Sequence, residues 1–199
     1  MFFDLDCIFL LKEYGMYKEY FNELKNCIDL LDINEIIQIK NVIVNVIKNK
    51  GNIYIIGNGG SASTASHYVV DFTKKLDFNN FPRVNMFNLS DNIPVITAYA
   101  NDISYESIYY EQLKNKIKGE DLLIVLSASG NSKNLVKAIK YAKEKQVKTI
   151  SIVGDFNGEV LKYSDDKIII NSKNYGIIED IHLIINHAIT SSIKEEYDG

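Results

Sequence analysis

After residue 51, short hydrophobic runs alternate with amphipathic stretches. The runs read as buried strands and lie at 53–57, 84–89, 122–126, 149–153 and 167–170. Consecutive apolar residues without polar alternation are typical of parallel strands covered on both faces. Apolar positions at helical spacing predict helices at 61–76, 93–99, 105–117, about 132–145 and 177–196, with a short one near 160. Asn101–Asp102 is expected to break the chain between two of them. This order predicts an α/β fold with a doubly wound, mainly parallel five-stranded sheet.

The first 50 residues lie outside this alternation and read as two amphipathic helices separated at Asp32–Asn34. The first carries the apolar stripe Leu10, Tyr14, Tyr17, Phe21, Leu24 and Ile28, and the second carries Ile36, Ile37, Val42, Val44, Val46 and Ile47. A long terminal stripe of this kind serves another subunit about as often as its own domain. Since no repeat or linker interrupts the chain, we expect one domain over 1–199. Residues 1–50 would be a helical extension packing on the domain and on other subunits, and 51–199 the α/β core.

The loop after the first predicted strand is rich in glycine. Gly57-Asn58-Gly59-Gly60 follows the strand, and Ser61 is expected to cap the helix that begins there. Glycines permit positive φ and let the backbone approach a ligand closely. A strand, a glycine turn and a helix N-terminus together direct backbone N–H groups and a positive dipole end at one point. The loop therefore predicts an anion site.

A second loop, at 127–132, carries three hydroxyls, on Ser127, Ser129 and Ser132, around Gly130. Hydroxyl donors at a helix N-terminus suit a phosphate monoester. No Lys follows a Gly as in the Walker loop, so bound nucleoside triphosphate is not expected. Taken alone, the loop is equally well read as a serine-rich turn with a helix cap. A second such loop at a strand end favours the phosphate site.

Residues 57–62 also fit the degenerate GxGxxA dinucleotide fingerprint. That site needs an acid at the end of the next strand to bind the ribose, but this strand ends in Asn88, and Asp91 comes three residues late. We therefore expect no nucleotide cofactor.

Two histidine and carboxylate pairs lie on different predicted helices. His67 and Asp71 stand at i and i+4, and Glu179 and His187 lie near one face of the last helix. Either pair alone reads as a helix-surface pair. Together they suggest a two-His, two-carboxylate metal set or a two-sided acid–base system. His182, on another face, reads as a packed or subunit-contact histidine.

Composition narrows the class of protein further. Against 22 basic residues the chain has 26 acidic ones, a formal charge of −4, which argues against a nucleic-acid surface. Cys7 and Cys27 lack metal-ligand spacing and read as free thiols, which suggests a reducing cytoplasm. No stretch reaches the length of a membrane span, and the acidic N-terminus is unlike a signal peptide.

The motifs together resemble the sugar isomerase (SIS) domain and, within it, the phosphoheptose isomerase family. The matching segments are GNGGSA at 57–62, Ser90-Asp91, Ala100-Asn101-Asp102, SASGNS at 127–132 and IEDIHLIINH at 178–187. The resemblance implies a homotetramer of flavodoxin-like subunits with active sites at subunit interfaces. Its reaction would convert sedoheptulose 7-phosphate into glycero-manno-heptose 7-phosphate.

The resemblance also implies roles for single residues. Asp71 and His187 would be the acid–base pair, and His67, Asp71, Glu179 and His187 would bind Zn²⁺. The substrate would be bound by Asn58, Gly59, Gly60, Ser61, Asp91, Asn101, Asp102, Ser127, Ala128, Ser129, Ser132 and Glu179, with the three serines on the phosphate.

Two positions depart from the family pattern, which usually has Glu at Asp71 and Gln at Glu179. Asp is one methylene shorter, which withdraws the carboxylate by about an ångström. The added charge of Glu179 would strengthen a cation site or raise the pKa of nearby carboxylates. An aldose–ketose isomerase is thus the leading interpretation. The alternatives are an isomerase for another phosphosugar, a non-catalytic SIS module that binds a sugar phosphate or a protein, and, third, a dinucleotide-dependent oxidoreductase.

Overall fold

The computed structural model describes the backbone of residues 5–114 and 116–198 and the side chains of 12–114 and 116–198. Five strands, β1 (Asn52–Ile56), β2 (Asn85–Asn88), β3 (Leu122–Ser127), β4 (Lys148–Gly154) and β5 (Asp166–Ile170), form one sheet. Their order is β2-β1-β3-β4-β5, and every neighbouring pair is parallel. The predicted α/β class and five-stranded parallel sheet are confirmed.

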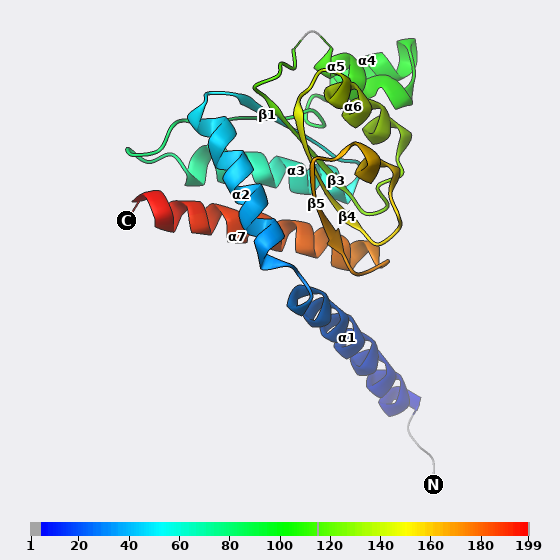
Figure 1. The fold of residues 1–199 in the computed structure, drawn as a ribbon. Helices are drawn as coiled ribbons and strands as arrows, with labels where there is room; N and C mark the ends of the chain where they lie inside the picture. Colours follow the sequence, from blue (N-terminus) through cyan, green and yellow to red (C-terminus); the bar gives the residue numbers. More distant parts are fainter. Residues whose placement is uncertain (1–4, 115, 199) are drawn as a thin grey trace.

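Helices cover both faces of this sheet (Figure 1). One face is covered by α2 (Ile33–Lys48), α3 (Gly60–Val70) with its continuation η1 (Asp71–Lys75), and α7 (Tyr175–Asp198). The other face is covered by α4 (Ile93–Asp102), η2 (Tyr105–Ser107), α5 (Ile108–Leu113), α6 (Lys133–Glu144) and η3 (Glu159–Tyr163). The strands alternate between the two cores as the pleat requires: Ile53 and Ile55 face the first, Tyr54 and Ile56 the second.

The predicted helix over 61–76 differs in two ways from the observed one. Its last turn, η1, is π-helical, a wide turn often found at functional sites. Its first turn is not capped by Ser61, which is buried. Instead Gly59, at φ 56°, precedes the helix, and its carbonyl accepts hydrogen bonds from the backbone N–H groups of Ala62 and Ser63. The prediction of Ser61 as the cap is therefore wrong, because the glycine backbone begins the helix without a side-chain oxygen.

The region around residue 101 also differs from expectation. Asn101 and Asp102 continue α4, because their side chains bond to each other (2.9 Å) and do not compete for the helix backbone. The predicted helix over 105–117 shortens to η2 and α5, since Lys114, at ψ 127°, leaves the helical region. Asn92 caps α4 by accepting from the N–H of Val95, as its position before the helix predicts.

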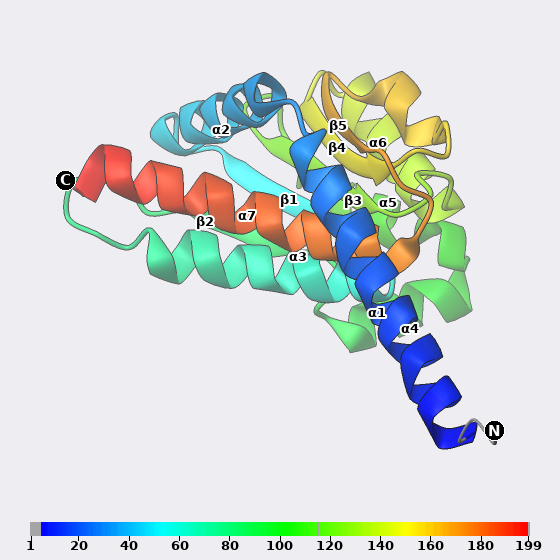
Figure 2. The ribbon, with the colours of Figure 1, turned by 90° about the horizontal axis from the view of Figure 1, so that it is seen from below.

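The first helix, α1 (Leu5–Asp29), extends away from the sheet and its layers (Figures 1 and 2). In its second half it is tied to the rest of the chain, where Tyr20 donates to Asp180 and Ser172 donates to Glu23. Tyr14, Tyr17 and Phe21 of the predicted stripe are each 60–68% exposed. The side chains of Leu10 and Cys7 lie outside the described residues, and the Cys27 thiol is buried and free. Among the described residues, no helix combines the length and the apolar character needed to cross a membrane.

Candidate active site

The two loops singled out in the sequence lie side by side at the carboxyl edge of the sheet. They follow β1 and β3, which are neighbours, while the helices after them, α3 and α6, go to opposite faces. A sheet of this order binds its ligands at that divergence point. A cavity of about 260 Å³ opens there. It is lined by Asn58, Gly59, Gly60, Ser61, Ser127, Ala128, Ser129, Ser132, Tyr175 and Glu179.

We call this cavity the phosphate pocket. Its first loop is held in place by side-chain amides and hydroxyls. Asn58 and Asn134 exchange two hydrogen bonds of 3.0 and 2.8 Å, and Tyr105 donates to the Asn58 Oδ1 at 3.2 Å. Ser90 donates to the Gly57 carbonyl at 3.0 Å, and Tyr109 donates to the same oxygen. The loop is therefore fixed before any ligand arrives.

The second loop folds around its own serines. The Ser127 Oγ accepts from the backbone N–H of Gly130 at 3.0 Å, and the Ser129 Oγ accepts from that of Asn131 at 3.2 Å. Gly130 has φ 66°, and a Cβ there would lie 2.9 Å from the Cα of Gly158, so only glycine fits.

Three helices, α3, α6 and α7, begin beside the phosphate pocket, as their first residues or the loops before them line it. Their N-terminal dipole ends and free N–H groups favour a negative charge there. The negative charge of the Glu179 carboxylate opposes this effect. This carboxylate lies directly beside Gly60, where an added Cβ would be 2.2 Å from its Oε2. The pocket thus suits a phosphate group, but it carries one carboxylate.

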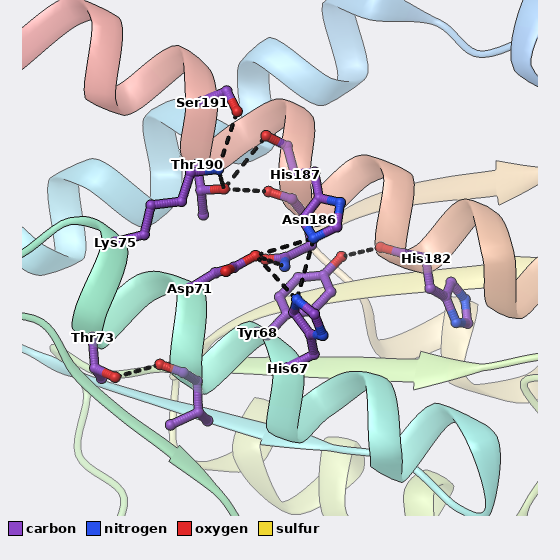
Figure 3. Close-up of polar contacts among 11 residues, drawn as sticks. His67, Tyr68, Asp71, Thr73, Lys75, His182, Asn186, His187, Thr190 and Ser191 are labelled. Carbon is purple, nitrogen blue, oxygen red and sulfur yellow. Dashed lines mark hydrogen bonds and ion pairs between the residues drawn. The ribbon is translucent and has the colours of Figure 1, made fainter.

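From this pocket α3 and α7 run side by side in the same direction (Figures 2 and 3). Polar contacts join them about once a turn along the α3–α7 seam. The Tyr68 hydroxyl donates to the His182 carbonyl at 2.9 Å, the Asn186 amide donates to Asp71 at 2.6 Å, and the Lys75 ammonium donates to the Thr190 hydroxyl at 3.0 Å.

Three side chains converge at the middle of this seam, as the close-up in Figure 3 shows. The Nε2 atoms of His67 and His187 lie 3.2 Å apart, and the Asp71 Oδ2 lies 3.6 Å from the first and 3.4 Å from the second. The Asp71 side chain is 14% exposed, whereas the two imidazoles are 46% and 49% exposed. We call this the His–Asp–His cluster.

The His–Asp–His cluster has the donor set and the spacing of a metal site. Ligand atoms about 2.0–2.1 Å from a small tetrahedral cation lie about 3.3–3.4 Å from one another. The three observed separations, 3.2, 3.4 and 3.6 Å, lie close to that edge length. The same atoms are also near enough to exchange protons with a ligand, so the cluster can act as a cation site, an acid–base site or both.

The structure groups only three of the four residues expected to bind a metal. Glu179 and His187 are eight residues apart on α7, a rise of about 12 Å. Glu179 accordingly lies in the phosphate pocket and not in the His–Asp–His cluster. No single ion is reached by both side chains within one chain.

The remaining expected substrate residues lie outside the pocket lining. Asp91 accepts from Ser66, the residue before His67, at 2.5 Å and from Asn88 at 2.8 Å. Asn101 and Asp102 are exposed at the end of α4 and pair with each other.

His182 is fully buried, as a packed histidine should be. One ring nitrogen, Nε2, lies 3.0 Å from the Ile152 carbonyl, which only accepts, so that nitrogen carries the hydrogen. Burial lowers the pKa of His182 to about 4, so the ring is neutral near pH 7.

Sequence reasoning missed residues that support the functional ones. Asn134 and Asn186 are buried and bond to Asn58 and Asp71, while Tyr175 borders the phosphate pocket. A signal did exist for Asn186: its spacing from His182 and Thr190 places a polar residue on the buried face of α7 at every turn.

The sequence and the fold of this chain are similar to those of known proteins. The family model for the SIS domain matches residues 17–154. The phosphoheptose isomerase of Helicobacter pylori (strain P12) is 32% identical over 186 residues, 94% of each chain. The probable phosphoheptose isomerase of Thermoplasma volcanium is 33% identical over 94% of this chain and 93% of its own. Among solved structures, a phosphoheptose isomerase from Francisella tularensis has a TM-score of 0.85 at 23% identity, covering 94% of this chain and 98% of that one.

Proposed function

Because this chain belongs to the SIS domain family and, within it, to the phosphoheptose isomerase family, we propose that it is an aldose–ketose isomerase of a phosphorylated sugar. The substrate that its relatives' name favours is a heptose phosphate, and we propose sedoheptulose 7-phosphate, converted into D-glycero-D-manno-heptose 7-phosphate. The observation that carries the proposal is the His–Asp–His cluster, a proton-transfer set on the same two helices that begin at a phosphate pocket.

The phosphate pocket would bind the phosphoryl end of the sugar. Ser127, Ser129 and Ser132 would donate hydroxyl hydrogen bonds, and the backbone N–H groups at the start of α6 would add theirs. Asn58 and Ser61 would contact the sugar from the opposite wall, with Asp91 nearby. This binding fixes one end of the substrate and leaves the carbonyl end for the proton-transfer residues.

The reaction needs two proton transfers between neighbouring carbons. One residue removes the proton from the carbon beside the carbonyl, which gives an enediol, and a second residue returns a proton to the adjacent carbon. Asp71 and His187 would share these two steps, and the order between them is left open. Asn186 and His67 touch this pair and would keep it in place.

A divalent cation would fit the same side chains, and we propose Zn²⁺. His67, Asp71 and His187 would bind it, and the donor set of two imidazoles and one carboxylate is one that zinc prefers. When bound, it would polarise the carbonyl and hydroxyl oxygens of the substrate. Glu179 would serve as the fourth ligand only from a second copy of the chain, because its own α7 separates it from the cluster.

The proposal includes a cytoplasmic homotetramer with active sites at subunit interfaces. Residues 1–199 would form a single SIS domain. Its helical extension, residues 1–50, would pack partly on the α/β core of the same chain and partly on neighbouring subunits. Two observations support this: the exposed Tyr14, Tyr17 and Phe21 of α1, and the position of Glu179. The free Cys27 thiol is in keeping with a reducing compartment.

The test is to incubate the protein with sedoheptulose 7-phosphate in D₂O, with and without Zn²⁺, and to follow the products by NMR. We expect the aldose to appear with deuterium at C2, since the enediol takes its proton from an exchangeable group. Pentose and hexose phosphates serve as comparison substrates.

The alternatives give different results in the same experiment. Turnover of a pentose or hexose phosphate alone would overturn the heptose assignment and leave the isomerase. No turnover of any phosphosugar, together with measurable binding, would favour the non-catalytic module.

A further inference from the structure

We propose that Asn186 is a positioning residue that orients the Asp71 carboxylate toward the two histidines. This inference rests on the proposed function, in which Asp71 acts. The fully buried Asn186 side chain lies beside Asp71 on the α3–α7 seam, and its Nδ2 donates to the Asp71 Oδ2 at 2.6 Å (Figure 3).

The chemistry of the pair determines which way the amide points. A carboxylate only accepts, so the Asn186 atom that faces it is the NH₂ group. This leaves the Asn186 Oδ1 buried with no hydrogen-bond partner among the described residues. An unpaired buried oxygen lowers stability, so an apolar residue would suit the core better. The amide is therefore better explained by what it does to Asp71 than by packing.

The bonded carboxylate oxygen is also the one that meets both histidines. The Asp71 Oδ2 lies 3.4 Å from the His187 Nε2 and 3.6 Å from the His67 Nε2. Among the described residues, the Asn186 amide is the only hydrogen-bond donor to this oxygen, while the two imidazole nitrogens lie at ion-pair distance. Without it, χ1 and χ2 of Asp71 would be free to turn the carboxylate toward solvent.

The need for such an anchor follows from the length of the side chain. Asp71 has a single methylene between its Cα and its carboxylate, so its reach is short. It reaches toward α7 from the first residue of the π-helical turn η1. A donor from the core of α7 fixes the short carboxylate at the distance where it meets His67 and His187.

The test compares Asn186→Leu with a matched control, Thr190→Val. Leucine keeps the volume of the side chain and removes the donor. Thr190 is one turn further along the same buried face. Its hydroxyl accepts from Lys75 and donates to the backbone carbonyl of Asn186, and it makes no hydrogen bond to the Asp71 side chain. Co²⁺ affinity, followed by visible absorption, and the kcat and KM for the sugar phosphate are measured for each folded variant.

For Asn186→Leu we expect Co²⁺ affinity and kcat each to fall about 10- to 100-fold, the usual effect of removing a partner of a ligating residue. KM should stay within about twofold, because the phosphate pocket lies about two turns away along α7. Thr190→Val should leave all three unchanged. In an Asp71→Asn background, Asn186→Leu should have no further effect, since the two act as a unit.

Several outcomes would overturn the inference. A folded Asn186→Leu with unchanged affinity and kcat would do so, and so would equal losses in Thr190→Val. If Asn186→Leu does not fold, Asn186→Ser, whose hydroxyl is too short to reach Asp71, is measured against the same expectations. Wild-type protein that binds Co²⁺ but turns over no phosphosugar would refute the proposed function alone, and the affinities would still decide on Asn186. A wild-type chain with neither property would overturn both.

Discussion

The phosphate pocket and the His–Asp–His cluster lie on the same helices but are built in different ways. The pocket consists mainly of two loops at strand ends, and its lining is made of glycines and short hydroxyl side chains together with Asn58, Tyr175 and Glu179. The cluster consists of side chains from two helices, and His67 and His187 are 120 positions apart in the sequence. One site depends on local backbone geometry and the other on how two helices pack.

This difference predicts different failures. A backbone site is lost when the backbone changes conformation, and side-chain substitutions weaken it by degrees. A side-chain site is lost when one carboxylate or imidazole is removed or misplaced, because about an ångström matters for proton transfer. In kinetic terms, damage to the pocket should appear mainly in KM and damage to the cluster mainly in kcat.

Asp71→Asn is expected to have the largest effect. It keeps the shape of the side chain and removes the charge at the centre of the cluster. We expect kcat to fall about 10³-fold, within the range for loss of an acid–base group, with KM little changed. Asp77→Asn, two residues past η1, is the matched control, since among the described residues the Asp77 carboxylate makes only a long ion pair with Arg83 (3.9 Å). Comparable activity in Asp71→Asn and wild type would remove Asp71 from the mechanism.

Acid should destabilise the side of the molecule that carries the cluster, through His182. Its folded pKa of about 4 lies below the ordinary 6.5, so between these values the unfolded chain binds a proton that the folded chain does not. The contribution of His182 to the free energy of unfolding is therefore fully present above pH 6.5, and it falls by roughly 3 kcal/mol as the pH drops toward 4. The free energy of unfolding, measured with urea at several pH values in this range, should depend less steeply on pH for His182→Gln than for wild type. Identical slopes would mean that His182 does not titrate on unfolding.

Gly130→Ala tests the backbone of the pocket. Gly130 is in the left-handed region at φ 66°, and a Cβ there would lie 2.9 Å from the Cα of Gly158. We expect KM for the sugar phosphate to rise about 10- to 100-fold, the cost of one or two charge-assisted hydrogen bonds, with a smaller change in kcat. Gly119→Ala, where a Cβ meets nothing within 4 Å, is the control. A loss confined to kcat would contradict the division between the two sites.

Glu179→Gln should have the smallest effect and is the sharpest probe of the pocket. The substitution removes a carboxylate from beside the expected phosphate position and keeps an amide oxygen of the same reach. We expect KM to fall about threefold, as for a partly screened charge pair, and kcat to be retained. This gain should shrink at high salt. A rise in KM would show that the carboxylate binds the sugar instead of opposing its phosphate.

The same contrast explains what the sequence could and could not predict. The strands, the two loops and the phosphate pocket follow from local signals: apolar runs, glycines and serines at strand ends. The pairing of His67 with His187 could be hypothesised but not placed, because it depends on the parallel packing of α3 and α7. Helix spacing puts Glu179 near the same face as His187 and so predicts one group, yet the rise along α7 separates the two residues by about two turns.

Other differences have equally specific causes. Short polar residues usually end helices by bonding to the backbone, and at Asn101 and Asp102 they bond to each other instead. The exposure of the α1 stripe could not be predicted, since amphipathic spacing does not tell which surface will cover it. The π-helical turn has no composition of its own and appears only in the structure.

That π-helical turn, η1, makes this segment tolerant of a change in chain length. A π turn holds about one residue more than an α turn, so deleting one residue within 72–75 would restore a regular α-helix. The wide turn absorbs the extra residue, so Asp71 and the buried Leu76 would keep their phase relative to each other. A deletion within the regular part of α3 would instead rotate everything after it by about 100°. A one-codon deletion in η1 should therefore be less harmful than one within α3, and length variation among homologues in this helix should fall in η1.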